Sequence, residues 1–311
     1  MTRSASRLRG LGGLCAFVFA AVAIFKLIFL LMDLRAGKGS HEVTIGSKAD
    51  TEGILLAEII ARRIERATGL TVTRRTALGG TQLCFQALLS GEVDLYPEYT
   101  GTALVALLER PAMTDPRKTF EVVQLELLRK KELVLLEPFA FNNTYALAMA
   151  KSKAQALGVR TITDLARHPG LSAGFTAEFM ARQDGWPGLR ERYGLEFRTA
   201  PRTLEAGLMY RAAQQSEVDL ISAYATDGRI EKFDLLVLED DKHFFPPYQA
   251  APLIRRSALT KHPALGPALE PLAGRLTDDE MRRLNAAVDI DRQRPEDVAE
   301  KYVRALDAER R

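Results

Sequence analysis

The chain has 311 residues, of which 47% are apolar and 27% are charged, so it is long enough to fill the cores of two lobes or domains. Its formal net charge is +3. Residues 1–40 carry six basic side chains and one acidic one, which leaves the rest of the chain close to neutral, at −2. A body with this charge has no basic face for DNA or RNA, which excludes a nucleic-acid partner.

The first feature along the chain is the apolar run Leu11–Met32, which follows three arginines. As a helix it is long enough to cross a bilayer core of ~30 Å. Basic residues on its N-terminal side place the remaining chain outside the cytoplasm, on the periplasmic face of the membrane. We interpret residues 1–36 as an uncleaved membrane anchor. A cleaved signal peptide is the alternative, although only a poor cleavage site is present, around Ala36.

Residues 43–95 alternate short apolar runs, typical of strands, with segments whose apolar residues have helical spacing. Thr51 is the expected N-cap, and Glu52 a favourable first-turn acid, of a helix that closes at Gly69. A second helix is expected over residues 79–91, between a Gly-Gly-Thr opening and a glycine stop. Strands are expected at Val43–Gly46, Thr71–Ala77 and Val93–Leu95. This β-α-β-α-β order predicts a parallel, doubly wound sheet with flanking helices.

A second α/β pattern begins after Tyr145. Its expected elements are strands at Ala146–Ala150, Leu171–Phe175, Val218–Tyr224 and Leu235–Leu238, a helix near Thr163–Arg167 and a helical tail from Pro263. The two patterns predict two α/β lobes, each a mainly parallel sheet flanked by helices, with residues 42–141 plus 250–311 in lobe 1 and residues 142–249 in lobe 2. The chain is expected to cross between them near Phe141–Asn143 and Gln249–Ala251.

The residue types that enzymes use are poorly placed in this chain. None of the four histidines, His41, His168, His243 and His262, has another at metal-ligand spacing. No nucleophile motif or phosphate loop is present. Cys84, the one cysteine beyond the N-terminal run, is interpreted as a small core residue of a helix. We therefore expect no catalysis, no metal and no cofactor.

Four tyrosines stand where extended apolar runs give way to loops: Tyr99, Tyr145, Tyr224 and Tyr248. A ring in this position, beside Pro, Asn, Thr or Gly, points into a cleft more readily than into a core. Several π-faces around one cleft suit a quaternary ammonium group, which is positively charged but has no N–H to donate. Taken singly, however, a tyrosine is usually a half-buried packing residue with a polar tip.

Two cationic residues have similarly ambiguous settings. Lys48 precedes a helix N-terminus, where its charge and the helix dipole together favour a carboxylate. On position alone, a solvated surface lysine is the commoner interpretation. Arg182 lies near the end of a helix, before a Gln-Asp-Gly turn, and fits either a surface salt bridge or a charge-assisted hold on a carboxylate.

An ordered set of short segments separates these alternatives. The segments are GSK followed by TE, LGGT, GEVDLYPEYTGT, FNNTYAL, DGWPGLRERYGL, AYATDGRI and EDDKHFFPPYQAAP. From about Glu42 to the C-terminus, the chain resembles the substrate-binding proteins of osmoprotectant ABC importers, the glycine betaine/carnitine/choline-binding family. The resemblance implies a two-lobed periplasmic-binding-protein fold of type II, with the C-terminal helices returning to lobe 1. It also implies delivery of a betaine-like ligand to an ABC permease that works with a separate ATPase subunit.

The same resemblance assigns roles to particular residues. It implies an aromatic cage formed by Tyr99, Tyr145, Tyr224 and Tyr248, carboxylate contacts from Lys48, Thr102 and Arg182, and a backbone carbonyl at Asn143 near the ammonium. Tyr96 is implied to be a supporting residue. The family's GSKNFTEQ is GSKADTEG here, so Ala49, Asp50 and Gly53 depart from the pattern. The loss of an aromatic at position 50 and of a glutamine at 53 is expected to alter the pocket without removing the cage.

The cationic contacts lead us to expect that carboxylated betaines bind more tightly than choline, because a buried cation without its anion is costly. Three alternatives remain. They are a choline-selective receptor, a membrane-anchored sensory or adaptor protein with the same pocket, and an enzyme that acts on a small amine.

Overall fold

The computed structural model describes residues 41–309. The predicted anchor or signal segment, residues 1–36 with the apolar run 11–32, lies outside this range. No helix within the described residues is both long and apolar enough to span a membrane. Residues 43–311 form one compact unit, and its described part contains two five-stranded sheets.

The first sheet has the strand order β2-β1-β3-β10-β4. Its strands are β1 (Glu42–Gly46), β2 (Thr71–Arg75), β3 (Leu95–Tyr99), β4 (Leu133–Leu135) and β10 (Ala250–Arg255). Strand β1 runs parallel to β3, with Ile45 beside Leu95, whereas β10 is antiparallel to both β3 and β4. We call this sheet and the helices packed on it lobe 1.

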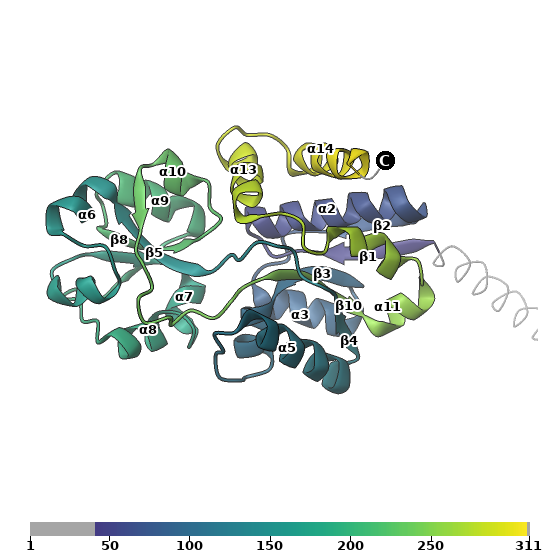
Figure 1. The fold of residues 1–311 in the computed structure, drawn as a ribbon, viewed down its shortest axis with the longest axis horizontal. Coiled ribbons are helices and arrows are strands. Elements are labelled where there is room, and N and C mark those ends of the chain that lie inside the picture. Colours follow the sequence, from purple (N-terminus) through teal and green to yellow (C-terminus); the bar gives the residue numbers. More distant parts are fainter. Residues whose placement is uncertain (1–40, 310–311) are drawn as a thin grey trace, which may run out of the picture. The chain divides into compact units, whose positions relative to one another are not determined.

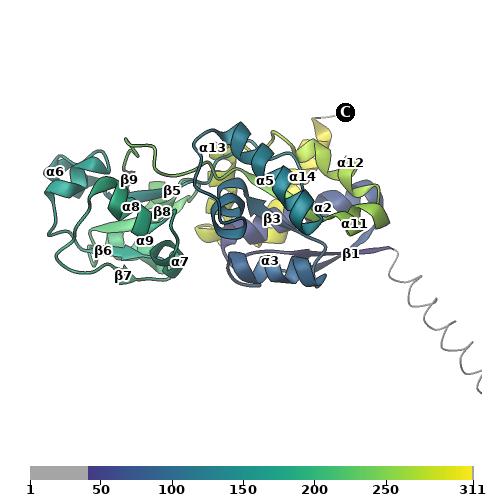
Figure 2. The ribbon, with the colours of Figure 1, turned by 90° about the horizontal axis from the view of Figure 1, so that it is seen from below.

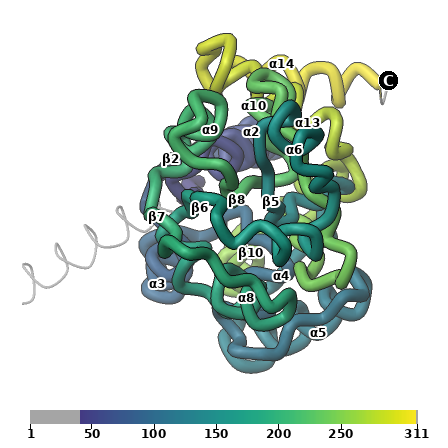
Figure 3. Tube along the Cα trace, turned by 90° about the vertical axis from the view of Figure 1, so that its left-hand side faces the viewer, coloured from purple at the N-terminus to yellow at the C-terminus, as the bar shows by residue number. Residues whose placement is uncertain are grey.

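The second sheet has the order β7-β6-β8-β5-β9. Its strands are β5 (Tyr145–Ala150), β6 (Ala173–Phe175), β7 (Arg202–Thr203), β8 (Leu220–Tyr224) and β9 (Leu235–Val237). Strand β6 is parallel to β7 and β8, and β5 is antiparallel to β8 and β9. This sheet and its helices are called lobe 2, and they face the viewer in Figure 3.

Each sheet is mainly parallel, as predicted, and contains one antiparallel strand, β10 in lobe 1 and β5 in lobe 2. Both β5 and β10 are the first strand after the chain has crossed from one lobe to the other, as Figure 1 shows. The crossings lie between Leu135 and Tyr145 and between Val237 and Ala250. They pair with each other through an antiparallel bridge between Asn142 and Gln249. The exact lobe boundaries, at residues 141/142 and 249/250, stay a prediction.

Helices cover both faces of each sheet. In lobe 1, α2 (Thr51–Thr68) and α14 (Pro295–Ala308) lie on one face, and α3 (Thr81–Ser90) and α5 (Pro116–Lys131) lie on the other (Figures 1 and 2). The short α4 (Thr100–Thr102) continues directly into a π-helical turn, and α11 (Arg256–Lys261) follows β10. The C-terminal helices α12 (Leu265–Leu269), α13 (Asp278–Asp289) and α14 pack against α2, so they return to lobe 1 as the resemblance implied.

The helices of lobe 2 are shorter. They are α6 (Lys151–Leu157), α7 (Ala177–Ala181), α8 (Trp186–Tyr193), α9 (Ala206–Gln214) and α10 (Arg229–Lys232). Helices α9 and α10 lie on one side of the sheet and α7 and α8 on the other (Figures 1 and 3). The helix expected near Thr163–Arg167 is a 3₁₀ turn.

Two local predictions are corrected by the structure, and a third is confirmed. Helix α2 is capped by Asp50, whose carboxylate accepts from the Gly53 N–H at 2.7 Å, so Thr51 is the first helical residue rather than the N-cap. The strand expected at Val93–Leu95 begins at Leu95 instead and runs to Tyr99. Cys84 is fully buried on α3, as predicted.

Candidate functional site

The pocket between the two lobes is lined by residues from both of them and is called the cleft below. Seven of the eight predicted ligand residues line it: Lys48, Tyr99, Thr102, Asn143, Tyr145, Tyr224 and Tyr248. The eighth, Arg182, contacts the cleft from behind, with its guanidinium carbon 5.8 Å from the centre of the Tyr145 ring. The structure therefore brings together residues separated by up to 200 positions in the sequence.

Three of the four predicted cage rings form one cluster around Tyr145. The ring of Tyr145 lies 5.3 Å from that of Tyr224 and 5.5 Å from that of Tyr248. Phe179 and Phe245 support it from the core side, at 5.1 and 6.2 Å. Tyr145 and Tyr224 are adjacent because they face each other as partners across the antiparallel strands β5 and β8. Rings at these separations offer both faces and edges to a ligand.

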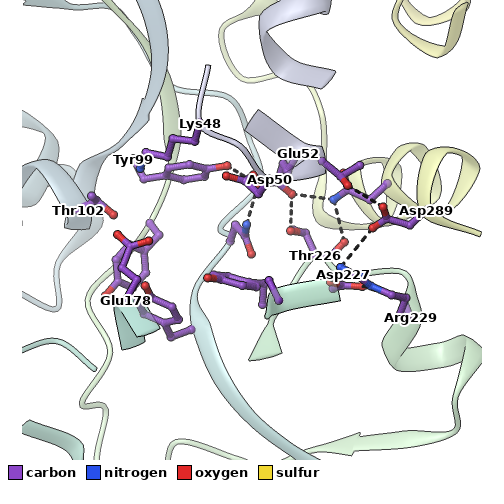
Figure 4. A pocket seen from close by; sticks show the side chains of 17 residues that line it. Lys48, Asp50, Glu52, Tyr99, Thr102, Glu178, Thr226, Asp227, Arg229 and Asp289 are labelled. Carbon is purple, nitrogen blue, oxygen red and sulfur yellow. Dashed lines mark hydrogen bonds and ion pairs between the residues drawn. The ribbon is translucent and has the colours of Figure 1, made fainter. Parts of the chain in front are cut away.

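The fourth ring, Tyr99, ends strand β3 on the lobe 1 side of the cleft. Its hydroxyl donates a hydrogen bond to Glu52 Oε1 at 2.7 Å, and Lys48 Nζ lies 5.0 Å from the ring centre. Thr102 is on α4, three residues further along the chain, and is buried against the same end of the pocket. Figure 4 shows Lys48, Tyr99 and Thr102 at the end of the cleft opposite Arg229 and Asp289.

The ammonium group of Lys48 is already paired with a carboxylate of the protein. Its Nζ donates to Glu98 Oε1 at 2.7 Å, and Glu98 is completely buried. Glu98 also accepts from the Tyr99 N–H and, at 2.8 Å, from the hydroxyl of Tyr96. Tyr96 therefore has the supporting position that the resemblance implied. The buried acid raises the pKa of Lys48 although burial itself opposes this, so the side chain is charged and neutralised internally.

Arg182 is held in the same way. It follows the last turn of α7, where its Nε donates to Asp184 Oδ1 at 2.7 Å and its Nη1 to Glu178 Oε1 at 3.2 Å. Asp184 is almost fully buried and also accepts from the Tyr248 hydroxyl at 2.7 Å. The expected preference for carboxylated betaines assumed that Lys48 and Arg182 have no anion of their own. That premise is wrong, since each cation has a buried protein carboxylate beside it.

Glu52 has a larger part in the site than its sequence position indicated. Its Oε1 accepts from Tyr99 and from Asn143 Nδ2 at 2.7 Å, and its Oε2 accepts from Thr226 Oγ1 at 2.5 Å and Asn285 Nδ2 at 2.8 Å. Because Thr226 follows β8 in lobe 2, this buried carboxylate of α2 joins the two lobes. Burial raises the pKa of Glu52 to about 7, and the hydrogen bonds from Thr226, Tyr99 and Asn285 partly oppose this rise.

The two asparagines that contact Glu52 each leave one atom without a partner. Their Nδ2 atoms are both turned to Glu52, so their carbonyl oxygens face away from it. The Oδ1 atoms of Asn143 and Asn285 are buried and have no hydrogen-bond partner among the described residues. Both residues line the cleft. For Asn143, the predicted contact was its backbone carbonyl; that role stays a prediction, and the structure adds the side-chain carbonyl as a second acceptor.

A cluster of charged side chains, Arg229, Asp227 and Asp289, lines the end of the cleft opposite Lys48. Arg229, at the start of α10, donates to both oxygens of Asp227, at 2.8 and 2.5 Å, and reaches Asp289 of α13 at 3.3 Å. Asp289 in turn accepts from Thr51 at 2.6 Å. Sequence reasoning missed this group. Its only local signal was the AYATDGRI segment, because α13 comes sixty residues later.

Neither a metal centre nor a catalytic group is apparent in this pocket. Within residues 41–309, no three His, Cys, Asp or Glu side chains are grouped as metal ligands. No serine, cysteine or histidine is among the described residues that line the cleft. What the site offers is a set of rings and hydrogen-bond acceptors, an arrangement suited to holding a small organic cation.

Two α/β lobes that are joined by two crossings and enclose such a pocket define a two-lobed ligand-binding protein. Comparison with known proteins agrees with this class. Residues 41–305 match the family model described as the substrate-binding domain of ABC-type glycine betaine transport systems. The chain belongs to this family.

Individual relatives support the assignment. The chain is 40% identical over 276 residues to a glycine-betaine-binding protein of Pseudomonas aeruginosa, which covers 85% of this chain and 88% of that protein. It is 32% identical over 294 residues to a carnitine transport binding protein of Listeria monocytogenes, covering 91% and 95% of the two chains. A crystal structure described as a glycine betaine/carnitine/choline ABC transporter superposes with a TM-score of 0.73 at 32% identity, covering 85% of this chain and 98% of that one.

Proposed function

We propose that this protein is an extracytoplasmic, non-catalytic receptor for small quaternary ammonium solutes, which it delivers to an ABC permease. The observation that carries the proposal is the cluster of Tyr145, Tyr224 and Tyr248 in the cleft, with ring centres 5.3 and 5.5 Å from that of Tyr145. Tyrosine faces attract a cation that has no hydrogen-bond donor of its own. Tyr99, Thr102 and Lys48 complete the proposed site from lobe 1.

Membrane attachment through residues 11–32 is part of the same proposal, because the basic residues before that run favour an extracytoplasmic body. The permease and its separate ATPase subunit are the proposed partners, as the family assignment supports. We propose that Arg182 acts behind the cage, where it fixes Asp184 and through it the hydroxyl of Tyr248.

The test is a calorimetric panel on the purified full-length chain with glycine betaine, proline betaine, carnitine and choline. We expect at least one of them to bind with one site per chain, and to be recovered chemically unchanged after incubation. No heat from any of the four at millimolar concentration would refute the receptor function. Conversion of a bound ligand into a product would favour the alternative of an enzyme for small amines.

A second candidate function is binding for a sensory system rather than for import. It is favoured by a 24% identical relative from Halobacterium salinarum that is named a chemotactic signal transduction system substrate-binding protein. Deletion of the permease proposed to take up the ligand separates the two. Uptake of labelled ligand should stop if this chain serves import, whereas a behavioural response that survives the deletion would support the sensory function.

A further inference from the structure

The cleft contains a carboxylate at the entrance to helix α2. Asp50 lines the cleft with an exposed side chain, one residue before the helix begins. Figure 4 shows it between Tyr99 and Glu52, on the lobe 1 side of the pocket. The N-cap of α2 therefore places a carboxylate at the wall of the cleft.

The backbone holds Asp50 in this place. Its Oδ1 accepts the hydrogen bond from the Gly53 N–H that caps helix α2. A side chain at position 53 would begin with a Cβ atom only 3.2 and 3.3 Å from the two Asp50 carboxylate oxygens and 3.3 Å from Lys48 Cβ. The glycine at position 53 thus leaves room for the Asp50 carboxylate.

The charge of Asp50 is not cancelled by a direct ion pair. Among the described residues, no Lys or Arg nitrogen lies within ion-pair distance of its carboxylate. Burial within the cleft raises the pKa of Asp50, and Lys48 opposes this rise only from a distance, because the Lys48 ammonium contacts Glu98 instead. Removing Lys48 from Glu98 to serve a ligand would leave a completely buried carboxylate without its cation, which is costly.

Two side-chain atoms of cleft residues lack a hydrogen-bond partner within residues 41–309, and both are acceptors that carry partial negative charge, like the Asp50 carboxylate. Asn285 is only 4% exposed, and its Oδ1 has no partner among the described residues. The Oδ1 of Asn143 is likewise unpartnered and buried. Both are acceptors whose orientation is fixed by the Nδ2 bonds to Glu52. A ligand that satisfies them must bring hydrogen-bond donors, whereas a ligand carboxylate brings only acceptors.

We propose that Asp50 is a specificity-determining residue that makes this cleft prefer quaternary ammonium alcohols, such as choline, to zwitterionic betaines. The inference rests on the proposed function of the same site and adds to it the chemistry of the ligand's second end. A hydroxyl donates to the acceptors of the cleft, and the net positive charge of choline is attracted to Asp50. A betaine has no net charge, and its carboxylate is repelled by the same aspartate.

The experiment measures dissociation constants of choline and glycine betaine for the full-length wild type and for Asp50→Asn. Asparagine keeps the capping oxygen of α2 and removes only the charge. The matched control is Asp115→Asn, the same change at the exposed N-cap of α5, where the aspartate accepts from the Lys118 N–H at 3.0 Å. Thermal melting of all three proteins shows whether the folding of either variant is affected.

We expect the wild type to bind choline about tenfold or more tightly than glycine betaine, the size of one charge-assisted contact. Asp50→Asn should reduce that ratio about fivefold or more, and Asp115→Asn should leave it unchanged. If both ligands bind and glycine betaine binds as tightly as choline, or Asp50→Asn leaves the ratio unchanged, the inference is overturned and the receptor function stands. If Asp50→Asn does not fold, the wild-type ratio alone decides. Binding of neither ligand would overturn the proposed function itself, and this inference with it.

Discussion

Removal of the Tyr224 ring tests the aromatic cage with the least disturbance of the core. Tyr224 is half-buried and lines the cleft from the end of β8, whereas Tyr145 and Tyr248 are buried. One desolvated cation–π contact is worth on the order of 1–2 kcal/mol, so Tyr224→Ala should weaken ligand binding by about 5- to 30-fold. Tyr224→Phe keeps the π-face and should weaken binding by less than about threefold.

The assay is calorimetry with the best ligand of the panel, together with chemical denaturation of each variant. Tyr224→Ala also loses its contact with Tyr145, at 5.3 Å, and should lower the free energy of unfolding by about 2 kcal/mol, less than for a fully buried ring. Affinity is therefore compared only under conditions where both variants are folded. Equal dissociation constants for Tyr224→Ala and the wild type would refute the cage, and equal losses in the Ala and Phe variants would show that the hydroxyl acts instead of the ring.

Three further predictions concern the lobes and the N-terminus. Because the pKa of Glu52 rises from 4.5 to about 7 on folding, its contribution to stability is complete below pH 4.5 and is lost as the pH rises through 7. The free energy of unfolding of the wild type relative to Glu52→Gln should thus fall by up to about 3 kcal/mol over this interval in denaturation curves, and a flat difference would contradict the pKa shift. Ligand should reduce the radius of gyration in solution scattering, since a two-lobed binder closes over its ligand; an identical profile at saturation would indicate a rigid pocket. The intact mass of membrane-extracted protein should include residues 1–36, whereas a mature N-terminus near residues 37–41 would identify a cleaved signal peptide.

The cleft tyrosines could be predicted from the sequence because each ends an apolar run or follows a loop segment that is typical of the family. Their arrangement relative to one another could not be predicted. Tyr145 and Tyr224 are direct partners only because β5 runs antiparallel to β8, and the prediction of a mainly parallel sheet did not say which strand would be the antiparallel one. Strand direction after a crossing depends on how the chain re-enters the sheet, which a local hydrophobic pattern does not record.

The electrostatics of the site were the least predictable part. The pairing of Lys48 with Glu98 requires the parallel register of β1 and β3, which brings residues fifty positions apart to the same end of the sheet. Arg182 is different, because Asp184 is only two residues away and could have been recognised as its partner in the sequence. Overlooking this pair had a consequence, because the expected preference for carboxylated betaines over choline depended on Lys48 and Arg182 both lacking a protein carboxylate.

The central claim is that the aromatic faces of the cleft recognise the positive charge of the ligand, rather than an apolar group of the same size and shape. It is tested most directly by titrating the wild type with choline and with 3,3-dimethylbutan-1-ol, its uncharged carbon analogue. The two have the same shape and hydroxyl group and differ only in the charge. Our account predicts that choline binds at least about tenfold more tightly, because two or more rings contribute cation–π attraction. Equal binding of the two compounds would contradict it.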